Sequence, residues 1–344
     1  MRIRKWLYPF GIIYGGIMAV RNFLYDAGLL QSTSFPMPVI LVGNLSVGGT
    51  GKSPHVAYLI ELLQSRFKVA TLSRGYGRST KGFLKVSSQS TAEDVGDEPL
   101  MYHLRFPDVA VYVCEDRRKA LHRIMEDDQS PQLVIMDDGF QHRRVEPSFK
   151  ILLTTFQQPF TNDYMLPAGN LREPRSGYWR ADCIIVTGCP NHLTADSQNT
   201  LMASLQPLPH QRVFFSSIHY GNPVSFGGQG FTDISKSDHC IAFAGIANPA
   251  SFFQHVQSRC GQFESVSYPD HHAFDRTSLI KWVSGHDSSV VFVTTEKDFV
   301  RLKSKGLLDV FNGYHACYIP ITIALDPQDA FNQMIMEHLE AFES

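Results

Sequence analysis

The sequence predicts an α/β protein in which helices flank a mostly parallel sheet and a second, smaller α/β domain follows. From residue 38 onward, apolar segments of strand length alternate with helical stretches, as in parallel α/β sheets. The 344 residues, 43% of them hydrophobic and 19% charged, suffice for two domains with sizeable cores. Glycine and proline cluster at 207–209 and 221–230. We therefore expect an N-terminal hydrophobic helix within 1–30, a larger domain at 31–220, and a smaller domain with a C-terminal helix at 221–344.

Individual elements follow from the apolar runs, which are continuous enough for strands covered on both faces. Strands of the larger domain are expected at 39–42, 69–72, 109–114, 133–136, 151–154 and 183–187, with helices at 54–64 and 116–126. In the smaller domain we expect strands at 240–244, 290–294 and 317–323, and helices at 250–258 and 327–342.

The N-terminus joins basic residues to a run of uncharged residues, 6–20. A secretory signal peptide has this order, but no small-x-small cleavage site follows the run. The run is too short to span a bilayer, which takes roughly 20 apolar residues. Two alternatives remain, a helix buried against the protein's own core and a helix in the membrane interface. We prefer the interface, where basic residues meet anionic lipid and aromatic residues act as anchors; the candidates are Arg2, Arg4, Lys5, Trp6, Tyr8, Tyr14 and Tyr25.

Charge and cysteine content argue against several classes of protein. With 31 basic and 33 acidic residues, the formal net charge is −2, so no positive field is available to hold DNA or RNA, and we expect no nucleic-acid partner. None of the six cysteines belongs to a C-x-x-C pair, which argues against a zinc ribbon or a thioredoxin-like site. Buried, reduced thiols fit this pattern and indicate the cytoplasm.

The most informative segment joins the first expected strand to the first expected helix and reads GNLSVGGTGKS over 43–53. Its glycines allow backbone N–H groups to point at a nucleotide triphosphate, and the following helix adds its N-terminal partial charge. Lys52 would reach the β- and γ-phosphates, and the Ser53 hydroxyl would bind Mg²⁺. The larger domain is thus predicted to be P-loop NTPase-like, although the general motif has glycine where this chain has Ser46. The nucleotide-binding candidates are Ser46, Val47, Gly48, Gly49, Thr50, Gly51, Lys52 and Ser53.

Two adjacent aspartates, Asp137 and Asp138, follow the apolar run 133–136. P-loop enzymes hold magnesium through an acidic residue at the end of a neighbouring strand. Burying both carboxylates unpaired would cost several kcal/mol each, so they are not core residues. A surface turn before Gly139 is the alternative. Beside a P-loop, the metal interpretation is favoured.

Further segments occur in a specific order along the chain: SRGYGR (73–78), GDEP (96–99), DDGFQH (137–142), PAGNLREP (167–174), DH (270–271) and TTEKD (294–298). With the loop at 43–54 and the hydrophobic N-terminus, they resemble the tetraacyldisaccharide 4′-kinase family over nearly the whole chain. The resemblance implies transfer of the γ-phosphoryl group of ATP, with Mg²⁺, to the 4′-hydroxyl of an acylated disaccharide 1-phosphate, a lipid A precursor. It also implies a peripheral or monotopic position on anionic lipid at the cytoplasmic face of the bacterial inner membrane, and no protein partner.

The catalytic candidates are Lys52, from the P-loop, and Asp97 and His271, from the resemblance. Asp97 would accept the proton of the sugar hydroxyl, although GDEP before an apolar run also suits a helix N-cap. His271 would orient Asp97 and tune its pKa. The alternatives for His271 are a structural turn and a zinc site, and no cysteine or third ligand lies nearby to favour zinc.

The remaining candidates concern substrate and metal. Arg74, Tyr76 and Arg78 lie in a glycine-rich loop and could contact substrate or phosphate, although a solvated basic loop is the alternative. Arg172 suits charge stabilisation of the substrate, and Glu173 suits Mg²⁺ or a supporting position. The predicted metal set is Ser53, Asp137, Asp138 and Glu173. The TTEKD segment is assigned no chemistry.

A membrane-attached partitioning-type ATPase or nucleotide switch is the alternative function. Such ATPases usually carry an extra lysine just before the paired glycines, where this chain has Val47. A guanine-nucleotide switch needs Asn-Lys-x-Asp, and the run Thr295-Glu-Lys-Asp298 lacks the asparagine. Both absences favour the kinase.

Overall fold

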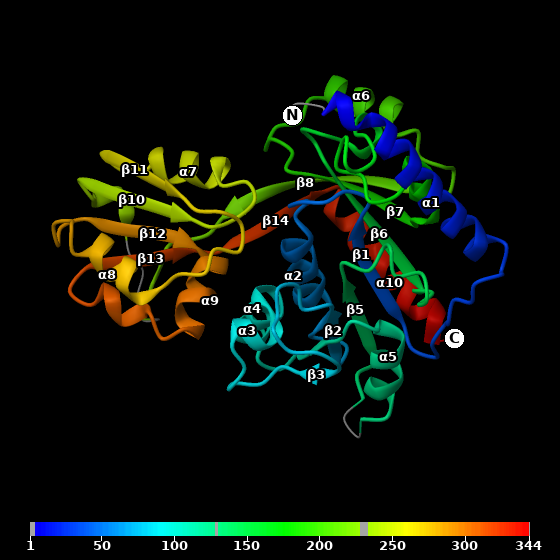
Figure 1. The fold of residues 1–344 in the computed structure, drawn as a ribbon, viewed down its shortest axis with the longest axis horizontal. Coiled ribbons are helices and arrows are strands. Elements are labelled where there is room, and N and C mark those ends of the chain that lie inside the picture. The colour runs from blue at the N-terminus through cyan, green and yellow to red at the C-terminus, as the bar shows by residue number, and fades with distance from the viewer. Residues whose placement is uncertain (1–3, 128–129, 228–232, 344) are drawn as a thin grey trace.

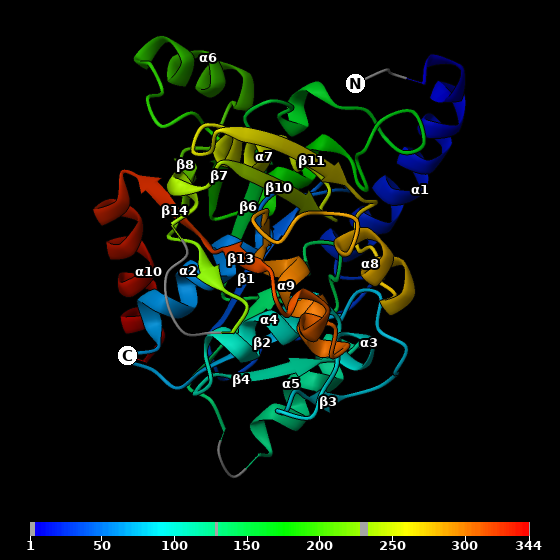
Figure 2. The same cartoon turned by 90° about the vertical axis from the view of Figure 1, so that its left-hand side faces the viewer.

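The computed structural model describes residues 4–127, 130–227 and 233–343, which form two α/β lobes (Figures 1 and 2). Arg2 of the basic N-terminus and residues 228–230 of the glycine-rich stretch lie outside the described residues. A nine-stranded sheet forms the larger lobe and a five-stranded sheet forms the smaller one.

The larger sheet has the strand order β14-β8-β7-β6-β1-β5-β2-β4-β3. Neighbouring strands are parallel except at the two edges, where β14 and β3 run antiparallel to β8 and β4. Register places Val42 of β1 opposite Asp137, the last residue of β5, and β1 ends two residues later at Asn44. The mostly parallel sheet predicted from the sequence is confirmed. Its strands are β1 (Val39–Asn44), β2 (Val69–Ser73), β3 (Leu84–Lys85), β4 (Ala110–Val113), β5 (Leu133–Asp137), β6 (Phe149–Thr155), β7 (Cys183–Thr187), β8 (Arg212–Tyr220) and β14 (Ile321–Asp326).

Helices cover both faces of this sheet. Alternate residues of β1 point to opposite faces, so Ile40 belongs to one hydrophobic core and Leu41 to the other. The Ile40 core is closed by α2 (Lys52–Leu63), α3 (Ala92–Val95), α4 (Asp97–Arg105) and α10 (Gln328–Glu343). The Leu41 core is closed by α5 (Arg117–Met125) and α6 (Ala195–Leu205).

The smaller sheet has the order β11-β10-β12-β13-β9, parallel except for β9. Its strands are β9 (Val224–Ser225), β10 (His239–Ala244), β11 (Gln262–Ser267), β12 (Val291–Thr295) and β13 (His315–Ile319), and its helices are α7 (Ala250–Gln257), α8 (Arg276–Val283) and α9 (Glu296–Ser304). β3, β8, β9, β11, α3, α6, α8 and α9 had no counterpart among the predicted elements, and α4 was considered only in the N-cap alternative for Asp97. β11, for example, is an edge strand with mostly exposed side chains, so it carries no apolar run.

The predicted strand 317–323 is two strands in different sheets. Pro320 separates β13 from β14, because proline has no N–H to donate to a ladder. β14 pairs with β8, and α10 then packs Phe331, Ile335 and Leu339 into the larger lobe. The sequence analysis placed these C-terminal residues in the smaller domain, whereas strand pairing places them on the larger sheet.

Helix α1 (Tyr8–Asp26) follows a short 3₁₀ turn and packs one face on the larger lobe (Figure 1). Tyr14 donates to the Arg172 carbonyl (2.9 Å), and Tyr25 lies beneath the Arg143 guanidinium, so these two predicted membrane anchors face the protein instead. The opposite face carries side chains between 60% and 64% exposed: Phe10, Ile12, Ile13, Ile17, Val20 and Phe23. No helix in the described part of the chain is long and apolar enough to cross a membrane.

Candidate active site

The P-loop lies between β1 and α2, at the carboxyl edge of the larger sheet. Gly48 and Gly51 have φ of +102° and +78°, which glycine adopts without a Cβ clash. The Asn44 side chain donates to the Thr50 hydroxyl (2.8 Å), and Thr187 of β7 donates to the Thr50 carbonyl (3.0 Å). Neighbouring strands therefore hold the loop in shape through its centre.

Lys52 and Ser53 begin α2 and meet acidic side chains. Lys52 Nζ lies 3.6 Å from Asp138 Oδ1. The Ser53 hydroxyl donates to Glu98 Oε1 (2.5 Å). The fold thus brings both predicted P-loop side chains to carboxylates, one just after β5 and one on α4.

Asp137 is the last residue of β5 and Asp138 follows it, and the two lie in different environments. Asp137 is buried, its Oδ2 accepts from the Tyr102 hydroxyl (2.9 Å), and its Oδ1 has no hydrogen-bond partner among the described residues. Burial, together with the charge of Glu98, raises the pKa of Asp137. Asp138 has φ of +53° and pairs with Arg172 (3.3 Å). The expectation that neither aspartate is a core residue is therefore wrong for Asp137, whose burial is accompanied by the hydrogen bond from Tyr102. A simple surface turn does not account for it either, because a surface turn would leave its carboxylate in water.

The oxygens around Ser53 suit Mg²⁺, which prefers hard oxygen ligands and usually takes only a few from protein, the rest from phosphate and water. Asp137 Oδ1 is a buried acceptor without a donor. Within the described ranges, no three His, Cys, Asp or Glu side chains converge on one point. The residues that could hold the ion are Ser53, Asp137 and Asp138, with Glu98 beside them, and they fit an ion shared with nucleotide phosphates.

Helix α4 carries Asp97 and Glu98 to the same place. Gly96 is the N-cap residue and no side chain caps the helix, so the alternative interpretation of Asp97 as an N-cap is wrong. Glu98 Oε1 accepts from Lys297 Nζ (2.6 Å) as well as from Ser53. Burial acts to raise the pKa of Glu98, but the Lys297 charge and these hydrogen bonds outweigh it and lower that pKa.

Asp97 meets two basic side chains of the smaller lobe. Its Oδ2 lies 2.8 Å from His271 Nδ1 and accepts from Arg301 Nε (2.6 Å). Burial acts to raise the pKa of Asp97, but His271 and Arg301 together lower it. The hydrogen bond to Asp97 raises the pKa of His271. The neighbouring His272 instead stacks on Tyr268, with ring centroids 4.4 Å apart.

Sequence reasoning missed Glu98, Lys297 and Arg301. The last two belong to α9, which follows β12 directly and begins within the TTEKD segment that had been assigned no chemistry. A usable signal was present, because ligands bind at the carboxyl ends of parallel strands, and TTEKD holds that position in the smaller sheet just as Asp137 does in the larger.

The predicted substrate loop divides into exposed and structural side chains. Arg74 is exposed, and Tyr76 is exposed with its ring centroid 5.3 Å from that of His271. Arg78 is only 3% exposed and donates to the Gly82 carbonyl (2.6 Å) and Glu115 (2.8 Å). These contacts favour a structural role for Arg78, while Arg74 and Tyr76 remain open to a ligand.

Arg172 and Glu173 are adjacent, but one side chain reaches the site and the other is buried in the structure behind it. Arg172 reaches Asp138 beside the P-loop. Glu173 is fully buried, and its carboxylate accepts from Asn22 of α1 (3.1 Å), Gln141 (2.9 Å) and Arg180. No contact among the described residues joins Glu173 to Ser53 or to the aspartates, so its surroundings favour support of the loop over metal ligation.

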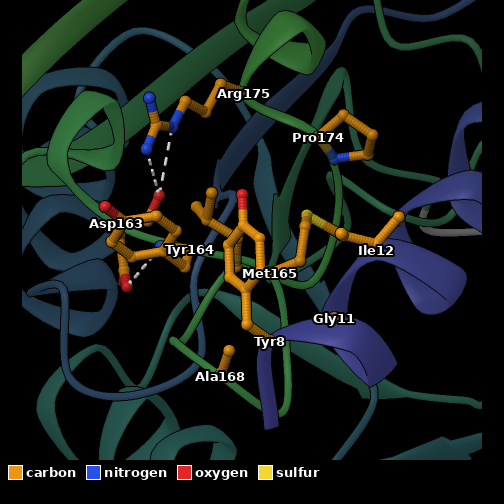
Figure 3. A pocket seen from close by; sticks show the side chains of 11 residues that line it. Tyr8, Gly11, Ile12, Asp163, Tyr164, Met165, Ala168, Pro174 and Arg175 are labelled. Atoms are coloured by element: carbon orange, nitrogen blue, oxygen red, sulfur yellow. Dashed lines mark hydrogen bonds between the residues drawn. The ribbon is translucent and has the colours of Figure 1, made fainter. Parts of the chain in front are cut away.

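A groove of about 290 Å³ separates α1 from the loop at 163–175 (Figure 3). Its lining is mostly apolar and includes Tyr8, Ile12, Met165, Ala168, Leu171 and Pro174. The rings of Tyr8 and Tyr164 meet edge to face across it, with centroids 5.8 Å apart. Arg175 lies at its side and donates to the Asp163 carbonyl (3.0 and 2.8 Å). The groove thus offers apolar surface beside the exposed face of α1.

Comparison with known proteins agrees with this geometry. The model of the family described as tetraacyldisaccharide-1-P 4′-kinase matches residues 3–340. The chain belongs to the tetraacyldisaccharide 4′-kinase family. The resemblance drawn from the motifs is thereby confirmed, and a membrane-attached ATPase or nucleotide switch is set aside.

Individual relatives support the family over the full length. Tetraacyldisaccharide 4′-kinase of Flavobacterium psychrophilum is 41% identical over 343 residues, 98% of each chain. That of Porphyromonas gingivalis strain W83 is 43% identical over 312 residues, covering 88% of this chain and 87% of the relative. The crystal structure of LpxK from Aquifex aeolicus in complex with ATP superposes with a TM-score of 0.77 at 31% identity, covering 98% of this chain and 99% of that one.

Proposed function

We propose that this kinase transfers the γ-phosphoryl group of ATP to the 4′-hydroxyl of a tetraacyldisaccharide 1-phosphate in lipid A biosynthesis. The names of its relatives support the reaction. The observation that carries the proposal is the meeting of a P-loop with a carboxylate held by a histidine, Asp97 with His271. The first suits a nucleotide triphosphate, and the second suits deprotonation of an alcohol.

In the proposed mechanism, Lys52 and the P-loop N–H groups hold the β- and γ-phosphates. Ser53, Asp137 and Asp138 would hold Mg²⁺, which would supply positive charge against the phosphates. His271 and Arg301 both contact Oδ2 of Asp97, and no described residue donates to its Oδ1. Oδ1 would therefore take the proton as the 4′-oxygen bonds to the γ-phosphorus and the bond from that phosphorus to the ADP oxygen breaks.

We further propose that α1 attaches the enzyme to the cytoplasmic face of the inner membrane, where the acyl chains of the acceptor reside. The exposed apolar face of α1 supports this, because it would otherwise stand in water. The groove beside α1 has a lining suited to part of an acyl chain. Arg74, Tyr76 and Arg172 are the side chains best placed to meet the headgroup.

The test is to incubate the purified protein with ATP, Mg²⁺ and the disaccharide 1-phosphate lipid and to identify the product by mass spectrometry. We expect a lipid with one added phosphate and one ADP formed for each. An acceptor whose 4′-hydroxyl is methylated is the matched control and should yield neither. ATP hydrolysis that is indifferent to the acceptor would contradict the proposal.

A further inference from the structure

Arg301 of α9 is 5% exposed and donates hydrogen bonds in three directions. Its Nε donates to Asp97 Oδ2 across the lobes (2.6 Å). Its Nη1 donates to Asp298 Oδ1 (2.7 Å) and to the Gly245 carbonyl (2.6 Å) within the smaller lobe. The candidate base and the end of β10 are therefore held by one guanidinium.

The Gly245 end of β10 also supports His271. The Gly245 carbonyl accepts from the His271 backbone N–H (3.2 Å), and the Gly245 N–H donates to Asp298 Oδ2 (3.0 Å). A Cβ at position 245 would lie 3.0 Å from Asp298 Oδ1 and 3.3 Å from Arg301 Nη1, so a larger residue would press on both partners, and glycine suits this close approach of the backbone. Arg301 thus contacts both the Gly245 carbonyl, which holds the His271 backbone, and Asp97, which pairs with the His271 side chain.

The Arg301 guanidinium pairs with two carboxylates, Asp97 and Asp298, and this arrangement suits orientation of the Asp97 side chain. Asp298 is fully buried, and Arg301 lies between it and Asp97. A guanidinium is planar, always charged and donates in fixed directions, which a lysine ammonium does not. Because Arg301 and His271 both engage Oδ2 of Asp97, the plane of that carboxylate is set and Oδ1 is left for a ligand.

We infer that Arg301 is a positioning residue, which orients the Asp97 carboxylate and the His271 loop for proton transfer from the acceptor hydroxyl. The inference rests on the proposed role of Asp97 as the base. Arg301 itself touches neither nucleotide nor acceptor in this arrangement. It acts through Asp97 and the partner of Asp97, His271, whose Nδ1 lies 3.5 Å from Arg301 Nη2. Its removal should therefore lower turnover without changing the Michaelis constant for ATP.

The test is a double-mutant cycle on kcat with Arg301→Gln, Asp97→Asn and the double variant. Arg301→Gln alone should lower kcat roughly 10- to 100-fold, the usual loss when a partner that orients a reacting group is removed. Because Arg301 acts through Asp97, the double variant should lie within about 2-fold of Asp97→Asn alone. Arg301→Lys keeps the positive charge beside Asp298 but loses the planar, fixed donor geometry of the guanidinium. Its kcat should therefore be intermediate between those of wild type and Arg301→Gln. If Arg301→Gln does not fold by its melting curve, the cycle is run with Arg301→Lys.

Arg105→Gln is the matched control, which tests whether loss of any contact between the lobes lowers kcat. Arg105 also bridges them, from Glu61 (2.7 Å) to Glu296 (3.5 Å), without touching Asp97, so its loss should leave kcat unchanged. Losses that multiply in the cycle, while Asp97→Asn alone is impaired, would overturn the inference and leave the base assignment standing. A fully active Asp97→Asn would overturn both.

Discussion

The carboxyl edges of the two parallel sheets face one site but contribute opposite chemistry. In the larger sheet, β1 and β5 pair side by side and lead into the P-loop and into Asp137. In the smaller sheet, β10 and β12 pair in the same way and lead into Gly245 and into α9, with Lys297 and Arg301. The larger edge, with α4, is acidic around one phosphate-binding loop, whereas the smaller edge is cationic.

The two sheets follow the same rule, that functional side chains lie at the carboxyl ends of parallel strands, but with different results. The larger edge is self-contained, because its loop is held by its own neighbours, Asn44 and Thr187. The smaller edge acquires a role only where it meets α4, through Lys297 on Glu98 and Arg301 on Asp97. An exposed ion pair such as Lys305 with Glu93 would add about 1 kcal/mol at most to that contact. The two less exposed pairs, Lys297 with Glu98 and Arg301 with Asp97, fix which side chains meet across the contact.

The largest effect is expected where the two edges meet. Asp97→Asn keeps the shape of the side chain and removes the base, so kcat should fall roughly 10²- to 10⁴-fold. ATP binding, measured by calorimetry, should be retained because the P-loop is untouched. Full activity in this variant would mean that the smaller edge does not orient a base.

Removing the central cation of the larger edge should have the next largest effect. Lys52→Ala deletes the ammonium that faces Asp138 and is expected to bind the phosphates. We expect kcat to fall roughly 10²- to 10³-fold, together with weaker ATP binding. That joint loss would distinguish it from Asp97→Asn. Near-normal kinetics with a native melting curve would remove Lys52 from the site.

Loss of His271 should give a smaller effect that depends on pH. His271 lowers the pKa of Asp97, which must be ionised to accept a proton. In His271→Gln that pKa should rise, so the acid limb of kcat should move to higher pH, with a loss of roughly 10-fold near neutrality. His272→Gln is the matched control and should leave the limb in place. If the acid limb of the kcat profile stayed in place in His271→Gln, the pairing of His271 with Asp97 would be contradicted.

The same pair predicts a trend in stability. The folded-state pKa of His271 is raised, so its contribution is fully present below the ordinary imidazole value of about 6.5 and is lost as pH rises through the raised value. The difference in melting temperature between wild type and His271→Gln should therefore shrink at high pH. A constant difference would indicate that packing, rather than charge, joins the lobes here.

The smallest effect should come from α1, outside both edges. Replacing Ile13 and Ile17 together by glutamate places charges on its exposed apolar face. Activity on acceptor in anionic vesicles should fall roughly 5- to 10-fold, and more than activity on detergent-dispersed acceptor. Ile280→Glu, on the exposed surface of α8, is the matched control and should change neither. Equal loss in both assays would argue against membrane attachment through α1.

Much of the larger lobe was predictable from local pattern. Its buried strands appear as apolar runs, the P-loop is contiguous, and Asp137 follows a strand directly. The remainder depended on partners far away. Tyr14 and Tyr25 look like membrane anchors in the sequence, yet they contact Arg172 and Arg143. Glu173 looks like a ligand, yet Arg180, Gln141 and Asn22 surround it.

The sequence by itself determined the fold class, the nucleotide loop and the family, because periodicity, glycine placement and short motifs are properties of contiguous residues. Only the tertiary structure decided which lobe holds β14 and α10, and that α9 brings Lys297 and Arg301 to Glu98 and Asp97. The reason is physical: the contacts of Asp97 join residues 174 and 204 positions apart. No local propensity encodes such contacts, since they depend on how two separate sheets direct their carboxyl edges toward one another.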